Sequence, residues 1–165
     1  MLVHFKVAGM VELSIIPRTS PLHYLGGMAA LNLPSPLGTG DWHMEETFFR
    51  QRHKRSRSFI SGVGCETDTT ALLGDAGVYD CTHIINDLKI PHESEPVFAA
   101  NHARAIADLV ISSILRGIAP NHIQLDDWMP RATDKQAVFD LLNMAATHLT
   151  EIQQQVMTTW ISKCA

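Results

Sequence analysis

The sequence contains few cysteines, and the three that it has, Cys65, Cys81 and Cys164, lie far apart. A disulfide-stabilised small domain needs an even set of closely spaced cysteines, and a zinc site built from cysteines needs pairs a few residues apart. Neither arrangement is present, so the sequence excludes both of these protein classes. Unpaired thiols are typical of a reducing compartment, and we expect a cytoplasmic protein.

The sequence also lacks a long apolar run. No stretch reaches the roughly 18 uncharged apolar residues that a membrane-spanning helix requires. The first sixteen residues are apolar enough to suggest a signal peptide, but Lys6 and Glu12 interrupt them and no basic segment precedes them. We therefore expect a soluble protein that is neither exported nor bound to a membrane.

Specific catalytic motifs are absent as well. Gly38, Thr39 and Gly40 form a glycine-rich turn, but no lysine follows at the spacing of a phosphate-binding loop, and Asp41 would repel a phosphate. No HExxH zinc motif and no internal repeat is present, and no segment carries the signature of a known family. The sequence therefore predicts no cofactor and no metal ion.

The composition fits one globular domain. The chain has 165 residues, 45% of them hydrophobic and 18% charged, which is enough apolar material for a core. The formal net charge is −4, and five of the thirteen basic residues lie within positions 50–57, so the rest of the chain carries −9. An acidic body repels a long polyanion, so any contact with nucleic acid is confined to that basic segment.

Hydrophobic periodicity predicts an α+β fold in which strands come first. Apolar residues alternate in residues 3–7 and 11–15 around a turn at Gly9, which predicts a β-hairpin. Residues 58–63 predict a short strand, and residues 78–88 a strand, a helix or both. We expect an N-terminal β-hairpin or small sheet followed by a helical C-terminal half.

Residues 21–32 predict the first helix. Pro21 stands at a typical first helical position, and the pattern ends near Asn32. Gly26 and Gly27 are unfavourable inside a helix, by about 1 kcal/mol each. A close backbone contact on that side would explain why glycine is there.

Residues 97–116 give the clearest helical pattern in the chain. Residues 94–96 read Ser-Glu-Pro, a typical helix start, and Gly117 is a typical stop. Between them an apolar face repeats at helical spacing through Ala103, Ile106, Val110 and Ile114. We expect one continuous helix with this face buried.

The last third of the chain is also predicted to be helical. Thr133 and Gln136 have the spacing of a capping box, and Thr150 and Gln153 have the same spacing. Whether residues 134–163 form one helix or an antiparallel pair stays open at this point.

Residues 33–57 hold the unusual chemistry of the chain. Two prolines and two glycines predict a loop, and Asp41, His43 and Glu45 follow it at alternate positions. In an extended segment these side chains would share one face and form an acid–base or metal-binding group. The ordinary alternative, which the capping rules favour, is that Asp41 caps a helix whose first turn contains Glu45.

A basic cluster follows, formed by Arg50, Arg52, Lys54, Arg55 and Arg57. It lies between Phe48 and Phe59, and basic groups beside aromatic rings are typical of single-strand nucleic-acid binding. The alternative is a solvated helix end or hairpin tip with the phenylalanines buried on its other side. In either case the cluster creates a local positive field that an acidic partner can use.

Two tryptophans in predicted loops, Trp42 and Trp128, either pack on the core or form the centre of an interface. We expect a partner-binding or regulatory protein of the antitoxin or immunity type, which contacts a macromolecule through the basic cluster and both tryptophans. The partner is expected to be a protein, while nucleic acid and a second copy of the chain stay open. The alternative is a small enzyme acting on a phosphate-bearing or nucleic-acid substrate through Asp41, His43 and Glu45.

Overall fold

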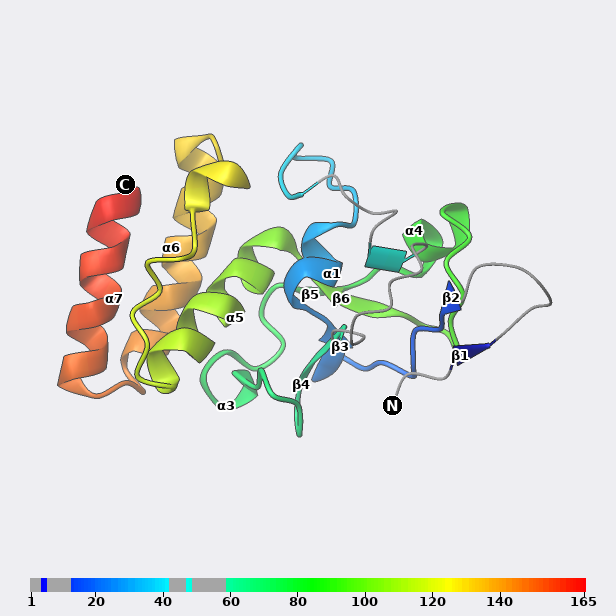
Figure 1. The fold of residues 1–165 in the computed structure, drawn as a ribbon, viewed down its shortest axis with the longest axis horizontal. Helices are drawn as coiled ribbons and strands as arrows, with labels where there is room; N and C mark the ends of the chain where they lie inside the picture. Colours follow the sequence, from blue (N-terminus) through cyan, green and yellow to red (C-terminus); the bar gives the residue numbers. More distant parts are fainter. Residues whose placement is uncertain (1–3, 6–12, 42–46, 49–58) are drawn as a thin grey trace.

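The computed structural model describes residues 4–5, 13–41, 47–48 and 59–165. All described strands precede residue 101, and the three long helices follow it, so the predicted α+β class is confirmed. Figure 1 shows the sheet on one side of the molecule and helices α6 and α7 on the other, with α5 between them.

The strand pairing of the predicted N-terminal hairpin is present. Strand β1 (His4–Phe5) pairs antiparallel with β2 (Leu13–Ser14), and Phe5 stands opposite Leu13. The alternation of apolar residues around Gly9 therefore gave the correct pairing for the described part of this segment.

A four-stranded mixed sheet follows. Its strands, in the spatial order β4-β3-β6-β5, are β3 (His23–Leu25), β4 (Ile60–Gly62), β5 (Val78–Asp80) and β6 (Phe98–Ala100). The two inner strands β3 and β6 are parallel, with Leu25 opposite Ala99, and both outer strands are antiparallel to their neighbours. Leu25 and Ala99 are completely buried, so the sheet centre belongs to the core.

The helix predicted for residues 21–32 is wrong in its first half. Residues 23–25 form strand β3, and α1 (Gly27–Leu31) is only one turn of the predicted helix, ending at Asn32. Gly26 lies between β3 and α1 and packs closely on β4. A Cβ atom at this position would lie 2.1 Å from the Ser61 hydroxyl oxygen. The close contact predicted from the two glycines is thereby confirmed.

Strand β5 stands between two short helices, α3 (Thr70–Leu73) and α4 (Thr82–Asp87). Residues 78–88 therefore contain both a strand and a helix, which was one of the three forms that the sequence allowed. Ile85 of α4 is completely buried and belongs to a second hydrophobic cluster, together with Ile16, Leu25 and Phe48.

The long helix predicted for residues 97–116 is confirmed as α5 (His102–Leu115), but it begins later than predicted. Residues 98–100 form strand β6 instead, because their backbone groups form hydrogen bonds with β3 on one side and β5 on the other. Asn101 is the true N-cap, and its side chain accepts the Arg104 N–H at 2.8 Å. The face of Ala103, Ile106, Val110 and Ile114 is buried as predicted.

The C-terminal third is an antiparallel helix pair, α6 (Ala132–Ala146) and α7 (Glu151–Cys164). The capping box at Thr133 is wrong, because α6 already begins at Ala132 and no side chain caps it. The box at Thr150 and Gln153 is confirmed with both of its hydrogen bonds. None of the described helices combines the length and apolar character needed to cross a membrane.

Candidate functional site

The loop of residues 33–41, called the anchored loop below, folds against the first turn of α5. His102, the first residue of that helix, is 6% exposed. Its Nε2 atom donates to the Leu33 carbonyl at 2.8 Å, and its Nδ1 atom lies 2.7 Å from the Thr39 hydroxyl. Because Nε2 carries the proton of the neutral ring, Nδ1 accepts and the Thr39 hydroxyl donates. One buried ring therefore holds both ends of the loop.

Burial lowers the pKa of His102 below its ordinary value, although hydrogen bonds to the backbone of Leu33, Ala30 and Thr39 act in the opposite direction. The ring is neutral near pH 7 and serves as a fixed donor and acceptor. A general base has to reach a proton of its substrate, and His102 has almost no accessible surface for that contact. We therefore interpret His102 as a positioning residue for the loop.

Further hydrogen bonds tie the anchored loop to α1 and to the segment before α6. They join the Gly40 N–H to the Trp128 carbonyl (3.1 Å), the Asp41 N–H to the Leu31 carbonyl (2.8 Å), and the Arg131 guanidinium to the Leu37 carbonyl. The backbone of the loop is thus fixed at its start, near its middle and at its end. These hydrogen bonds restrain the backbone of the loop.

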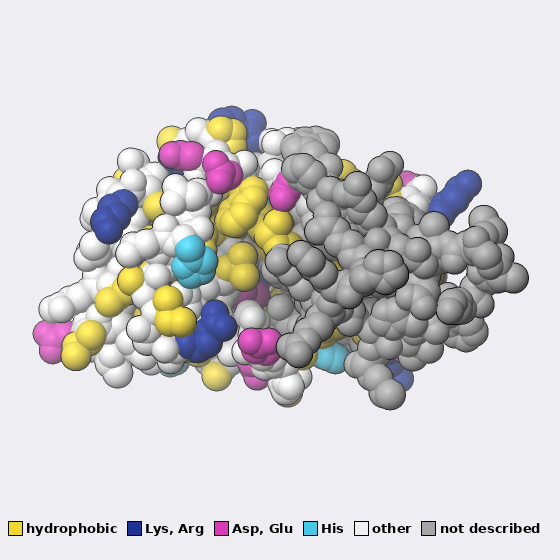
Figure 2. All heavy atoms as spheres, viewed as in Figure 1, with side chains coloured by type: hydrophobic (Ala, Val, Ile, Leu, Met, Phe, Trp, Pro, Cys, Tyr) yellow, Lys and Arg dark blue, Asp and Glu magenta, His cyan; other side chains and the backbone are white. Residues whose placement is uncertain are grey.

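The anchored loop nevertheless exposes a large apolar side chain, since Leu37 is 60% exposed. Half-buried hydrophobic side chains of α1, α5 and the segment before α6 pack on the core, among them Met28, Leu109 and Trp128. Figure 2 shows hydrophobic side chains gathered where Figure 1 places α1 and α5, with acidic side chains above them. This face offers an apolar centre with a charged edge.

Most of the predicted site residues lie outside the part of the chain that the structure describes: Trp42, His43, Glu45, Arg50, Arg52, Lys54, Arg55 and Arg57. Asp41 and Trp128 are described, at the end of the anchored loop and beside it. The convergence of Asp41 with His43 and Glu45, and the role of Asp41 as a helix cap, stay predictions.

The two described residues that flank positions 42–46 come together at the end of α1. The Asp41 N–H is bonded to Leu31, and the Thr47 hydroxyl accepts a hydrogen bond from the Asn32 side-chain amide. Asn32 is 6% exposed, and its Oδ1 atom has no hydrogen-bond partner among the described residues. A buried acceptor without a donor is unusual, because it forfeits the hydrogen bond that water would give.

Phe48 and Phe59, the described residues nearest to the basic cluster on either side, pack against each other. Their ring centroids lie 5.5 Å apart. Phe48, 2% exposed, is a buried member of the second hydrophobic cluster, and the partly buried Phe59 packs against that cluster. An aromatic ring that stacks on a nucleic-acid base needs an open face. The interpretation in which the phenylalanines are buried is therefore supported for Phe48, whereas Phe59 is only partly buried.

Sequence reasoning missed a buried polar network around Arg104 and Asp108. Both side chains are 0% exposed, and Arg104 Nε lies 2.7 Å from Asp108 Oδ1. The guanidinium also donates to the carbonyls of Gly74 (3.0 Å) and Ala76 (2.5 Å) and to the hydroxyls of Tyr24 (3.0 Å) and Thr69 (3.1 Å). The Asp108 carboxylate in turn accepts from the Tyr24 hydroxyl at 2.6 Å and from the Thr69 hydroxyl at 2.5 Å.

This network joins the sheet, α3 and α5, and it is closed to solvent. Burial and the Asp108 carboxylate raise the pKa of Tyr24, so the phenol keeps its proton and stays a donor. The sequence signal was an arginine and an aspartate four residues apart on a helix. Without access for a substrate, the network stabilises the fold and is not a catalytic centre.

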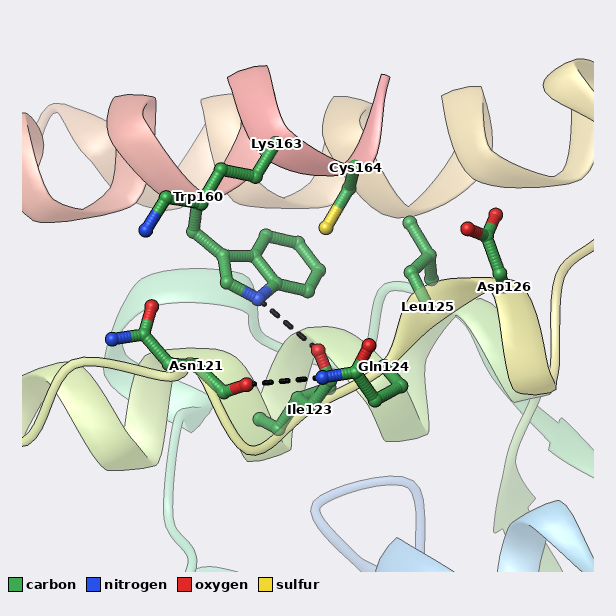
Figure 3. A pocket seen from close by; sticks show the side chains of 8 residues that line it. All are labelled: Asn121, Ile123, Gln124, Leu125, Asp126, Trp160, Lys163 and Cys164. Atoms are coloured by element: carbon green, nitrogen blue, oxygen red, sulfur yellow. Dashed lines mark hydrogen bonds between the residues drawn. The ribbon is translucent and has the colours of Figure 1, made fainter.

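A cavity of about 260 Å³ lies between the end of α7 and residues 121–126 (Figure 3). Trp160 forms part of its wall and donates from Nε1 to the Ile123 carbonyl at 3.4 Å. The Cys164 sulfur points toward the indole. Burial raises the pKa of this thiol, and a protonated thiol is a poor nucleophile, so the cavity is not favoured as a catalytic site.

The described residues hold no arrangement of three His, Cys, Asp or Glu side chains that could bind a metal ion. The anchored loop, with its exposed tip and the apolar face beside it, is therefore the best-defined candidate site. Comparisons with models of protein families, with curated proteins and with solved structures gave no significant match to this chain.

Proposed function

We propose that this chain is a small partner-binding protein that contacts another macromolecule through the anchored loop and the apolar face beside it. The observation that carries the proposal is an exposed Leu37 on a loop whose two ends are held by the buried His102. A loop that is already fixed loses little conformational entropy on binding, which favours affinity. Trp128 adds a residue type that is enriched at the energetic centres of interfaces.

The proposed partner is a protein. Leu37 and Trp128 offer apolar contact area, whereas nucleic acid is bound chiefly through phosphate-binding charges and exposed rings. Phe48 is buried and offers no such ring face, and Phe59 is partly buried against it. Outside the basic cluster the chain carries a net charge of −9, which repels a polyanion.

The proposal predicts that Leu37→Asp abolishes partner binding without loss of stability. Leu37 is 60% exposed, so its replacement leaves the core intact, while a carboxylate at the tip has to be desolvated on an apolar contact. The matched control is Ile152→Asp, because Ile152 is 74% exposed on α7. Both variants should melt within a few degrees of wild type.

The measurement is affinity capture from the host extract with wild type and both variants as baits, followed by mass spectrometry. A protein retained by wild type and by Ile152→Asp but lost with Leu37→Asp supports the proposal. A parallel sample treated with nuclease shows whether nucleic acid bridges the contact. Capture that is equal for all three baits would reject the anchored loop as the contact site.

A second prediction concerns the basic cluster. Replacing Arg50, Arg52, Lys54, Arg55 and Arg57 with glutamine should leave the free energy of unfolding nearly unchanged, since solvated charges contribute little to it. The same change should weaken binding of the captured partner, and binding by wild type should fall as salt is raised. A control that replaces the exposed Arg18 and Lys163 with glutamine removes charge elsewhere. Equal affinity of wild type and the fivefold variant at low salt contradicts this prediction.

One observation favours the alternative, a small enzyme acting on a phosphate-bearing or nucleic-acid substrate. Asp41 and Thr47, on either side of His43 and Glu45, are both held at the end of α1, beside the unpaired Asn32 acceptor. Cleavage of an added RNA or phosphodiester by wild type, abolished by His43→Ala, would favour the enzyme over the binding protein. Unchanged substrate after prolonged incubation would favour the binding protein.

A further inference from the structure

We propose that His102 makes the anchored loop sensitive to pH, so that protonation of its imidazole releases the loop and weakens binding of the partner. The effect on binding rests on the function proposed above, whereas release of the loop is a property of the chain alone. The geometric basis is that one buried ring supplies a hydrogen bond at each end of the loop.

Protonation reverses one of these two hydrogen bonds. The neutral ring donates to Leu33 and accepts from Thr39. A protonated Nδ1 becomes a donor, so the Thr39 hydroxyl has to direct its own hydrogen to another acceptor. Because Thr39 is 3% exposed, water is not available for that purpose. The protonated state thus combines a buried charge with a displaced hydrogen bond.

The surroundings of His102 do not supply a compensating negative charge from the described residues. Helix α1 and strand β6 contain no charged residue. Two charge pairs lie on the helices that contact the anchored loop: Arg104 with Asp108 on α5 and Arg131 with Asp134 at the start of α6. Asp41 is the charged residue of the anchored loop, and the shift in the pKa of His102 arises from burial and backbone hydrogen bonds, with no contribution from that carboxylate.

The direction of the pH effect follows from the lowered pKa of His102 in the folded loop. A histidine in a released loop titrates near its ordinary pKa of about 6.5. Above that pH both states are neutral and the loop is fully held. As the pH falls through about 6.5, the released state takes up a proton that the held state does not, so the held state loses stability.

Amide hydrogen exchange of the free protein tests the release. The Gly40 and Asp41 amides are bonded to Trp128 and Leu31, and the Cys81 amide, bonded to Val97 at 2.8 Å directly beside strands β5 and β6, is a control away from the loop. Between pH 7.5 and 5.5 the protection factors of Gly40 and Asp41 should fall in wild type, by at most about tenfold, since pH 5.5 lies one unit below the ordinary histidine pKa. That of Cys81 should stay constant.

The His102→Gln variant provides the matched comparison. Its amide can still donate to Leu33 and accept from Thr39, but it does not titrate, so protection at Gly40 and Asp41 should be the same at both pH values. If this variant does not hold the loop, the ring of His102 in wild type, followed by NMR, should titrate below pH 6.5. Constant protection in wild type, a parallel fall at Cys81, or a ring that titrates at or above 6.5 would overturn the switch, while the Leu37→Asp capture result would stand on its own.

Discussion

Replacing Arg104 with methionine should lower the free energy of unfolding by about 3–5 kcal/mol, the range observed when one partner of a buried ion pair is removed. The substitution keeps the length of the side chain but leaves the Asp108 carboxyl group, which is 0% exposed, without its cation. It also removes the donors that satisfy the carbonyls of Gly74 and Ala76. Urea unfolding followed by circular dichroism gives the change directly.

Arg116→Met is the matched control, because the same substitution is made at an arginine that follows the same helix. Arg116 lies 3.9 Å from Glu66, and the two side chains are 54% and 86% exposed. A pair in solvent of this kind contributes about 0–1 kcal/mol. If the two variants lost the same stability, the Arg104 network would not be the stabilising feature that its burial indicates.

A double variant separates the loss of the pair from the burial of a charge. Arg104→Met combined with Asp108→Leu should be less destabilised than Arg104→Met alone, since no buried carboxylate is left without its cation. The hydroxyls of Tyr24 and Thr69 lose their acceptor in this background, so stability should not return to that of wild type. A double variant as unstable as the sum of the two single variants would show that the residues act independently.

Gly40→Ala is expected to destabilise the protein by about 2–5 kcal/mol, from a left-handed backbone and an overpacked site. Gly40 has a φ of +98°, and an added Cβ would lie 2.4 Å from His102 Cε1 and 2.5 Å from the Leu31 carbonyl oxygen. Neither neighbour can move easily, because both are held by the hydrogen bonds that fix the anchored loop. Thermal unfolding at pH 7.5 measures the loss.

Gly38→Ala serves as the control within the same loop. Gly38 also has a positive φ, +70°, but nothing lies within 4 Å of an added Cβ. Its replacement should lower the free energy of unfolding by about 1–2 kcal/mol, which is the cost of a left-handed backbone at a residue with a Cβ atom. The difference between the two variants therefore measures the close approach of the loop to His102, and equal losses would mean that this contact does not stabilise the loop.

The sequence predicted correctly those structural elements that depend on residues a few positions apart. The buried face of α5 follows from a period of 3.6 residues, and the cap at Thr150 follows from two residues three positions apart. The start of α5 was misplaced because an apolar run suits either a strand or a helix, and pairing with β3 decides for the strand. The strand is favoured only once Leu25 and Ala99 are paired, and residues so far apart in the sequence form no local pattern.

The candidate site likewise combines a local feature that the sequence predicted with long-range contacts that it did not. Prolines and glycines predicted a loop before Asp41, and the structure has a loop there. The residue that holds it, His102, is more than sixty positions away and was only one of nine histidines. The buried network was missed for the same reason, since Tyr24 lies 84 positions from Asp108. Polar residues that interact across such separations carry no spacing by which a single sequence identifies them.

The parallel pairing of β3 with β6 also sets an order of events during synthesis. Strand β3 can pair with β4 as soon as residue 62 is available, but its other edge waits for residues 98–100. At a translation rate of about 5–20 residues per second, the Tyr24 hydroxyl waits about 4–17 s for Asp108. During that interval the nascent chain carries an uncovered strand edge beside apolar side chains. The N-terminal half can therefore complete its sheet only after residues 98–100 have been synthesised.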